Sequence, residues 1–264
     1  MKIVQKAAVA LASVVLVSCG GGGGNAALSK TFSYGAAQAP TTAEQTAATS
    51  AKSSVTASSS FGATPDGTKA TTIVSLADDL AASALGSVAV AAGVPQSAQL
   101  SHALRSAATV PACTTTTATS VTFTNCTDTE SGFSFTLNGT ISSTNNVLTW
   151  DITGGFAGSD QGVTFNVNIH QSGSLTVTAT TLSGNGLSEI SGSASGSGQT
   201  INFGVSTAAL INLTYTPTCV TSGTIEVKRV WSPRPNGATA AQLPDVAVKL
   251  TWTGCDTISV QHSI

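Results

Sequence analysis

The second half of the chain, from Cys113 to Ile264, alternates apolar and polar residues with a period of two. Leu148, Trp150 and Ile152, for example, are separated by Thr149 and Asp151. Such alternation is typical of antiparallel strands that have one buried face and one solvated face. The alternating runs are split by clusters of Gly and Asn, which favour turns. They lie at 133–141, 148–152, 163–169, 175–179, 187–190, 201–205, 210–215, 224–231, 246–252 and 258–260.

About ten short strands in sequence, with tight connections, predict a meander. A sheet of that size curls or closes, because exposed edges and an uncovered apolar face both favour aggregation. We therefore expect a mainly β domain over residues 111–264, built as an antiparallel meander in a strongly curved sheet or barrel. A β-sandwich of two sheets is the alternative. The runs have no fixed repeat period, which argues against a solenoid.

Residues 71–110 have a helical pattern instead. Ile73, Leu76 and Leu80 are spaced for one helix face, and Leu100 and Leu104 for a second. A Gly-Val-Pro sequence at 93–95 separates them as a helix stop. The pattern predicts an Ala-rich helical hairpin that packs on the sheet.

The N-terminus begins with a basic stretch, Lys2 and Lys6, followed by an apolar run that ends in Leu16-Val17-Ser18-Cys19. The run is too short to cross a bilayer as a helix, which needs about 20 apolar residues. The arrangement resembles the lipobox signal peptide of bacterial lipoproteins. That resemblance covers only the first two dozen residues.

The resemblance implies a signal peptide over residues 1–18 and a mature chain that starts at Cys19. In that class the cysteine carries a thioether-linked diacylglycerol and an amide-linked acyl chain such as palmitate, and two or more chains hold a protein stably on a membrane. Gly20 follows the cysteine, not the aspartate that often signals inner-membrane retention in the class. The expected location is thus the cell envelope, as an outer-membrane lipoprotein.

Residues 19–70 combine the lipidated cysteine with a low-complexity stretch of Gly, Ala, Ser, Thr and Gln. It contains few large apolar side chains to offset the entropy cost of ordering. We expect a flexible tether, in which Phe32, Tyr34 and Phe61 are the exceptions that could dock locally.

With Cys19 acylated, four cysteines remain, and an even count in an oxidising compartment predicts two disulfides, with three possible connectivities. Cys219 and Cys255 are equally far from Gly237, in a turn-rich stretch, so an antiparallel hairpin would bring them together. Cys113 then pairs with Cys126. A metal site is not expected, because no Cys-x-x-Cys pair or nearby histidine is present.

Charge and motifs limit the possible chemistry. Only 8% of the residues are charged and the net charge is −2, so no basic surface for nucleic acid is expected. The sequence has no nucleophile elbow, phosphate-binding loop or zinc-protease motif. His102, His170 and His262 are dispersed, and acidic pairs such as Asp128 with Glu130, or Asp151 with Asp160, are too few for a calcium site. We expect no catalytic residue, metal or cofactor.

The loop from Trp231 to Pro244 is the candidate interaction surface. Trp231 and Arg234 are of the residue types that most often dominate interfaces. In the other interpretation, Trp231 closes the core and Arg234 is merely solvated.

Three functions fit these patterns. The first is a non-enzymatic envelope lipoprotein whose β domain makes structural or adhesive contacts with an envelope or surface partner. The second is a carrier or binding protein for a lipid or other apolar ligand. The third and most distant is an envelope hydrolase.

Overall fold

A computed structural model describes residues 26–42, 44–46, 48–49, 113–117, 119–130, 133–160, 163–196, 198–235, 239–240 and 242–264. Cys19, the signal peptide and the expected helical hairpin at 71–110 lie outside the described residues. No helix in the described part of the chain has the length and hydropathy that crossing a bilayer requires.

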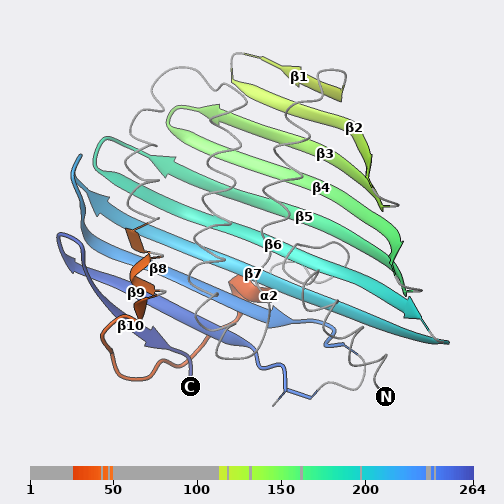
Figure 1. Cartoon of the computed structure of the whole chain (residues 1–264). Helices are drawn as coiled ribbons and strands as arrows, with labels where there is room; N and C mark the ends of the chain where they lie inside the picture. The colour runs from red at the N-terminus through yellow and green to blue at the C-terminus, as the bar shows by residue number, and fades with distance from the viewer. Residues whose placement is uncertain are drawn as a thin grey trace.

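In the described part of the chain, ten strands form one antiparallel sheet in which each strand pairs with its neighbours in sequence (Figure 1). The sheet is strongly curved, with β1 and β10 as its two edges. The strands are β1 (Thr114–Thr116), β2 (Ser120–Glu130), β3 (Phe133–Thr144), β4 (Val147–Asp160), β5 (Val163–Val177), β6 (Thr181–Gly196), β7 (Gln199–Tyr215), β8 (Val220–Trp231), β9 (Val246–Gly254) and β10 (Thr257–His262).

The predicted mainly β meander in a curved sheet is confirmed, and the sandwich alternative is wrong because all ten strands share one sheet. The strands are longer than predicted. Residues 163–169 and 175–179, expected as separate strands, belong largely to the single β5. The glycine between them, Gly173, continues the strand: a Cβ there would lie 2.2 Å from the Trp150 ring. The glycine therefore makes room for an aromatic side chain from β4 and does not mark a turn.

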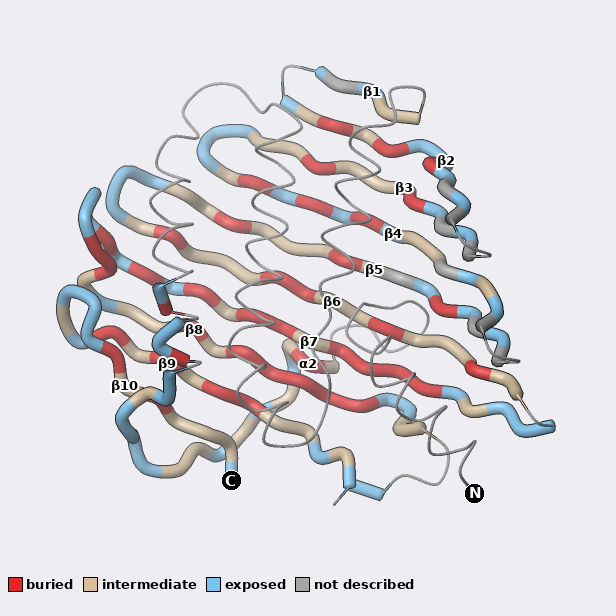
Figure 2. The backbone as a smooth tube through the Cα atoms, in the orientation of Figure 1, coloured by how far each residue is buried: buried red, intermediate tan, exposed pale blue. Residues whose placement is uncertain are grey.

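The two faces of the sheet differ in burial, as the alternating colours along each strand in Figure 2 show. One face, called the apolar face below, carries most of the buried side chains in the described residues. Its largest cluster extends over most of the sheet and includes Leu137, Trp150, Leu175, Leu213, Ile225, Leu250 and Val260. The opposite face carries the intervening polar residues and is called the polar face.

The described part of the expected tether is packed against the sheet, contrary to the prediction for residues 19–70. A short helix, α2 (Ala26–Ser29), lies on the polar face over β7 and β8, where Ala27 is fully buried beside Leu187, Ala208 and Val230. The chain then passes the outer edge of β10 (Figure 1).

Backbone bridges hold the chain at that edge. Tyr34 pairs with Ser263 and Gln38 with Val260, so the free edge of the last strand is covered. Beyond it, Ala48 joins the cluster on the apolar face. Residues 26–49, called the N-terminal segment below, thus hold the C-terminal edge of the sheet from both faces.

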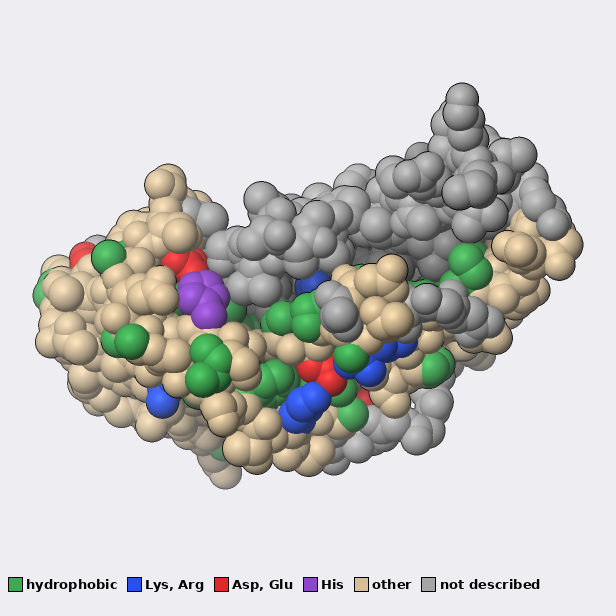
Figure 3. Space-filling model, turned by 90° about the horizontal axis from the view of Figure 1, so that it is seen from below, with side chains coloured by type: hydrophobic (Ala, Val, Ile, Leu, Met, Phe, Trp, Pro, Cys, Tyr) green, Lys and Arg blue, Asp and Glu red, His purple; other side chains and the backbone are tan. Residues whose placement is uncertain are grey.

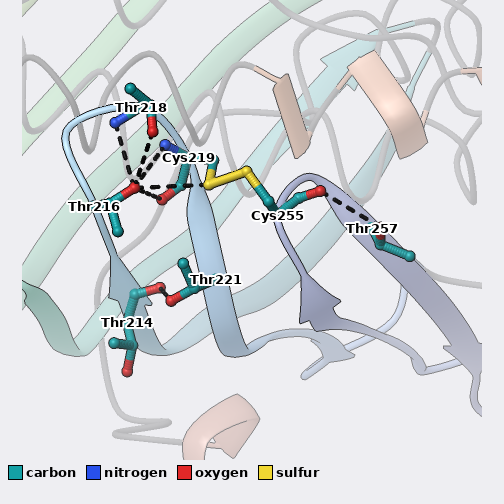
Figure 4. The surroundings of a disulfide bond; sticks show 7 residues. All are labelled: Thr214, Thr216, Thr218, Cys219, Thr221, Cys255 and Thr257. Carbon is teal, nitrogen blue, oxygen red and sulfur yellow. Dashed lines mark hydrogen bonds between the residues drawn. A yellow bond between two sulfur atoms is a disulfide. The ribbon is translucent and has the colours of Figure 1, made fainter.

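Both predicted disulfides are confirmed. Cys113 bonds to Cys126 and Cys219 to Cys255, and the second bond joins the start of β8 to the turn after β9 (Figure 4). In the β8–β9 pair, Glu226 lies opposite Lys249. The hairpin is therefore centred beside Gly237, as the spacing of the cysteines predicts.

Candidate functional site

The polar face of β3 to β6 is an array of hydroxyl and amide side chains. Its described members are exposed or half-buried, whereas the neighbouring residues on each strand point to the apolar face. No Lys or Arg occurs anywhere between Arg105 and Lys228. The array comprises Ser134, Thr136, Asn138, Thr140, Ser142, Thr149, Thr153, Thr164, Asn166, Asn168, Ser172, Ser174, Ser183, Asn185, Ser191 and Ser193.

Neighbouring strands of this face are connected by hydroxyl-to-hydroxyl hydrogen bonds. The Ser142 and Thr149 hydroxyls are 2.7 Å apart, and those of Ser159 and Thr164 are 3.0 Å apart. Each pair leaves lone pairs directed to solvent, because a hydroxyl has one donor and two acceptor sites. The face can therefore form hydrogen bonds with a polar, hydroxyl-rich partner.

One charged cluster lies within this array. His170 on β5 is placed between two carboxylates, with Nε2 2.9 Å from Asp151 Oδ1 on β4 and Nδ1 3.1 Å from Glu189 Oε2 on β6. The strand register explains the arrangement, since His170 is directly opposite Glu189 on β6, and on β4 it is opposite Thr153, two residues from Asp151 on the same face. With a carboxylate on each ring nitrogen, neither nitrogen is directed at a Ser or Thr hydroxyl, as a hydrolase triad would require.

His262, the other histidine in the described part of the chain, lies away from this cluster. His262 Nε2 lies 3.1 Å from the buried Glu44 Oε1, at the β10 edge. His102 and the side chains of Asp128, Glu130 and Asp160 are outside the described residues. Within the residues that the structure describes, no group of three His, Cys, Asp or Glu side chains has the arrangement of a metal site.

The candidate interaction residue Trp231 belongs to the core. It is only 7% exposed and packs in a second apolar cluster with Val167, Ile190, Phe203 and Val205. Trp231 therefore closes the core, as the second interpretation of the sequence predicts, and its ring does not present a surface to a partner.

Arg234 is held by the loop around Asp245. Its Nη2 donates to Asp245 Oδ1 and its Nε to the Leu243 carbonyl, at 2.9 and 3.0 Å. Lys30 from the N-terminal segment pairs with the other carboxylate oxygen, and the Trp231 amide donates to Oδ1. Figure 3 shows basic and acidic side chains next to one another on this side of the molecule. Asp245 thus connects the β8–β9 loop to the N-terminal segment.

These contacts lower the pKa of Asp245. Desolvation by burial acts to raise it, but the hydrogen bonds from Lys30 and the Trp231 amide and the charges of Lys30 and Arg234 outweigh that effect. A carboxyl whose pKa falls on folding stabilises the fold above its unfolded pKa, and this contribution is lost as the pH falls through the folded value.

We therefore expect Asp245→Asn to reduce the free energy of unfolding by about 1–2 kcal/mol at pH 7, the order of a charge-assisted hydrogen-bond network. The difference from wild type should be constant down to about pH 5 and shrink below about pH 4. Urea unfolding of the variant and the wild type at pH 7 and pH 3 measures it. An equal deficit at both pH values would contradict the assignment.

Two residues of β8, Glu226 and Lys228, extend the contacts of the N-terminal segment. The Tyr34 hydroxyl donates to Glu226 Oε1, and the Lys228 ammonium donates to the Lys30 carbonyl at 3.0 Å. Burial, then the hydrogen bond and negative charge of Glu226, raise the pKa of the Tyr34 phenol. Tyr34, one of the aromatic residues that could dock locally, thus contacts β8.

A polar row crosses the apolar face and was not predicted. Gln171, Ser188, Thr207 and Arg229 are successive register partners on β5 to β8, and they separate the two apolar clusters. Arg229 is 6% exposed, and burial lowers its pKa to about 10.

Comparison of the chain with protein-family models, curated proteins and solved structures finds no match.

Proposed function

We propose that this chain is an outer-membrane lipoprotein, held by acylated Cys19, whose β domain makes structural or adhesive contacts through its polar face. The observation that carries the proposal is the exposed hydroxyl and amide array on β3 to β6. Solvated sheet faces with no partner usually carry many charged side chains of both signs. A surface of Ser, Thr and Asn without Lys or Arg favours hydrogen bonding with a polar partner.

Two observations support the proposed location. The leader with Cys19 gives the export and lipidation signal, and the two disulfides are the kind of bond that persists in an oxidising compartment outside the cytoplasm. Neither observation depends on the polar face, so the location and the contact surface are tested separately.

The location is tested by fractionation and mass spectrometry. The wild-type protein should be found in the outer-membrane fraction with a diacylated, N-acylated Cys19 as its first residue. Cys19→Ala should move it to the soluble fraction or leave the leader uncleaved. An unmodified peptide that spans Ser18 and Cys19 in membrane-bound protein would reject the anchor.

The contact surface is tested with the unacylated domain, residues 20–264, mixed with cell-envelope fragments of the producing bacterium. We expect the wild type to sediment with the fragments and Thr153→Glu/Asn168→Glu to bind at least ten-fold more weakly, because two added carboxylates place charge among hydroxyl and amide side chains. Ala179→Glu, in the exposed β5–β6 turn, adds the same charge elsewhere and should bind like the wild type. Equal sedimentation of all three would rule out the polar face.

Arg229 favours a second candidate function, a carrier for an apolar ligand. A guanidinium buried on an apolar face loses hydration that an anionic headgroup would replace. Native mass spectrometry of the detergent-free domain distinguishes the two functions. A carrier retains extra mass that Arg229→Met removes, whereas a contact protein shows the polypeptide mass alone.

A further inference from the structure

The apolar face of the sheet needs a second layer, and the described residues supply only a small part of it. We propose that the predicted hairpin at residues 71–110 packs on this face and that Asp79 pairs there with Arg229. The inference rests on the proposed removal of the leader, which leaves residues 50–112 as the one long stretch of the mature chain outside the described residues.

Side chains in the middle of the apolar face are fully buried. Leu137, Leu175 and Leu213 are at most 1% exposed. A single sheet leaves its side chains open to solvent on any face that no other layer covers, so a second layer lies on this face. Among the buried residues of its largest cluster, Ala48 is the only one in the described part of the chain that lies outside the strands. Most of the second layer therefore comes from the rest of the chain.

Both ends of the stretch at 50–112 are fixed on the apolar side of the sheet. Just before it, Ala48 belongs to the large apolar cluster. Just after it, Cys113 is bonded to Cys126, which is 3% exposed in the same cluster. The first end follows the segment that covers β10, and the second directly precedes β1. The stretch thus leaves from one edge of the apolar face and returns to the other.

Only one part of this stretch has the side chains of an apolar layer. Residues 71–110 repeat large apolar side chains at helical spacing, as Ile73, Leu76 and Leu80 do. Residues 50–70, in contrast, contain a single Val and a single Phe among Ser, Thr, Ala and Gly. A helix with one apolar stripe buries that stripe against a larger apolar surface. Residues 71–110 therefore match the exposed need of the sheet.

Arg229 adds a match of charge. It lies on the apolar face and is only 6% exposed, and no carboxylate in the described part of the chain pairs with it. A buried guanidinium without a partner is costly, and a carboxylate in contact with it offsets part of the lost hydration. Residues 71–110 contain two acids, Asp78 and Asp79.

Helical spacing selects Asp79 from this pair. At about 100° for each residue, Asp79 lies about 60° from Leu76 around the helix axis, on the border of the apolar stripe. Asp78 lies about 140° or more from Ile73, Leu76 and Leu80, on the opposite side of the helix. The large apolar cluster of the sheet also ends at a polar row, which contains Arg229. A stripe bordered by an acid thus meets a cluster bordered by a cation.

Urea unfolding of residues 20–264 tests the ion pair, and the result does not depend on acylation because this domain lacks Cys19. Asp79→Asn leaves the guanidinium buried without its partner and should raise the unfolding equilibrium constant at pH 7 at least about 30-fold. In an Arg229→Met background, the same change should raise it less than three-fold. Asp78→Asn, the matched control, should have less than a three-fold effect in both backgrounds. If Asp79→Asn alone does not fold, the double variant should restore folding.

A replacement tests the layer itself. A Gly/Ser sequence of equal length in place of residues 71–110 should expose the apolar face, so that anilinonaphthalene sulfonate fluorescence rises at least ten-fold or the domain aggregates. The same replacement of residues 50–70 should leave the fluorescence within two-fold of the wild type.

Three results would overturn the proposal: equal effects of Asp78→Asn and Asp79→Asn, an effect of Asp79→Asn that persists in the Arg229→Met background, or unchanged dye binding without residues 71–110. Extra mass that Arg229→Met removes, in native mass spectrometry, would assign Arg229 to an anionic ligand instead. An exported protein that keeps its leader would refute the proposed function and leave the ion-pair result unaffected.

Discussion

Replacement of Trp231 by alanine is expected to lower the free energy of unfolding by about 3–5 kcal/mol, the usual cost of removing a buried Trp side chain. Trp231 ends β8 and fills the cluster of Val167, Ile190, Phe203 and Val205 on the apolar face. Deleting the ring leaves a cavity that strands of a regular sheet can close only by shifting their register, so the cluster does not collapse around it. Chemical unfolding of the soluble domain measures the loss.

Two variants show whether packing is the cause. Trp231→Phe keeps much of the ring volume and should cost less than half as much as alanine. Arg234→Ala removes the neighbouring candidate interaction residue but only part of the Asp245 network, and about 1 kcal/mol is expected. A Trp231→Ala protein as stable as wild type, yet deficient in binding to envelope fragments, would restore Trp231 as an interface residue.

The order and pairing of the strands could be predicted because they depend on patterns that are local in sequence. Alternation marks which residues face the core, and a meander pairs each strand with the next. The β8–β9 hairpin is the clearest example, since the equal distances of Cys219 and Cys255 from Gly237 predict its centre to within one residue of the observed register, in which Glu226 lies opposite Lys249. The register alone does not decide which side chains meet, because Glu226 contacts Tyr34 and Lys228.

The length of the strands could not be predicted from composition. Glycines are turn formers in a sequence, but Gly173 and Gly192 lie inside strands, where they face a Trp150 or Phe203 ring from a neighbouring strand. A glycine that makes room for an aromatic ring on the next strand has no signature along its own strand. It becomes recognisable only when the register is known.

The packing of the N-terminal segment was missed in part because some of its contacts use backbone groups. The Gly35 and Gln38 amides donate to the His262 and Val260 carbonyls, an interaction that any residue type can make. One signal was available, the Thr41-Thr42-Ala43-Glu44 sequence. Thr41 and Glu44 bond reciprocally as a capping box, which marks the start of a helix.

The charged cluster on the polar face shows that the same limit of sequence-based prediction applies to the candidate site. Asp151, His170 and Glu189 were visible as single polar residues on three different alternating runs. Only the register brings His170 opposite Glu189 and diagonal to Asp151. Sequence reasoning can therefore assign the face of each residue but not the neighbours it meets across strands.

Removal of the Cys219–Cys255 disulfide, by alanine at both positions, is expected to lower the free energy of unfolding by about 4 kcal/mol. The bond closes a loop with a sequence separation of 36, which spans β8, the β8–β9 loop and β9. The Cys113–Cys126 bond closes a loop with a separation of 13, and its removal should cost about 3 kcal/mol. The difference follows from loop length, because a longer loop loses more entropy in the unfolded chain.

Loss of both bonds, about 7 kcal/mol together, is comparable with the total stability of most domains, about 5–15 kcal/mol. The domain should therefore fold when exported or when oxidised in vitro, and remain largely unfolded when produced in a reducing cytosol. Unfolding of the two double-alanine variants and the quadruple variant measures each contribution. A fully reduced domain as stable as the oxidised one would remove both the energetic role of the disulfides and their support for the proposed location in the envelope.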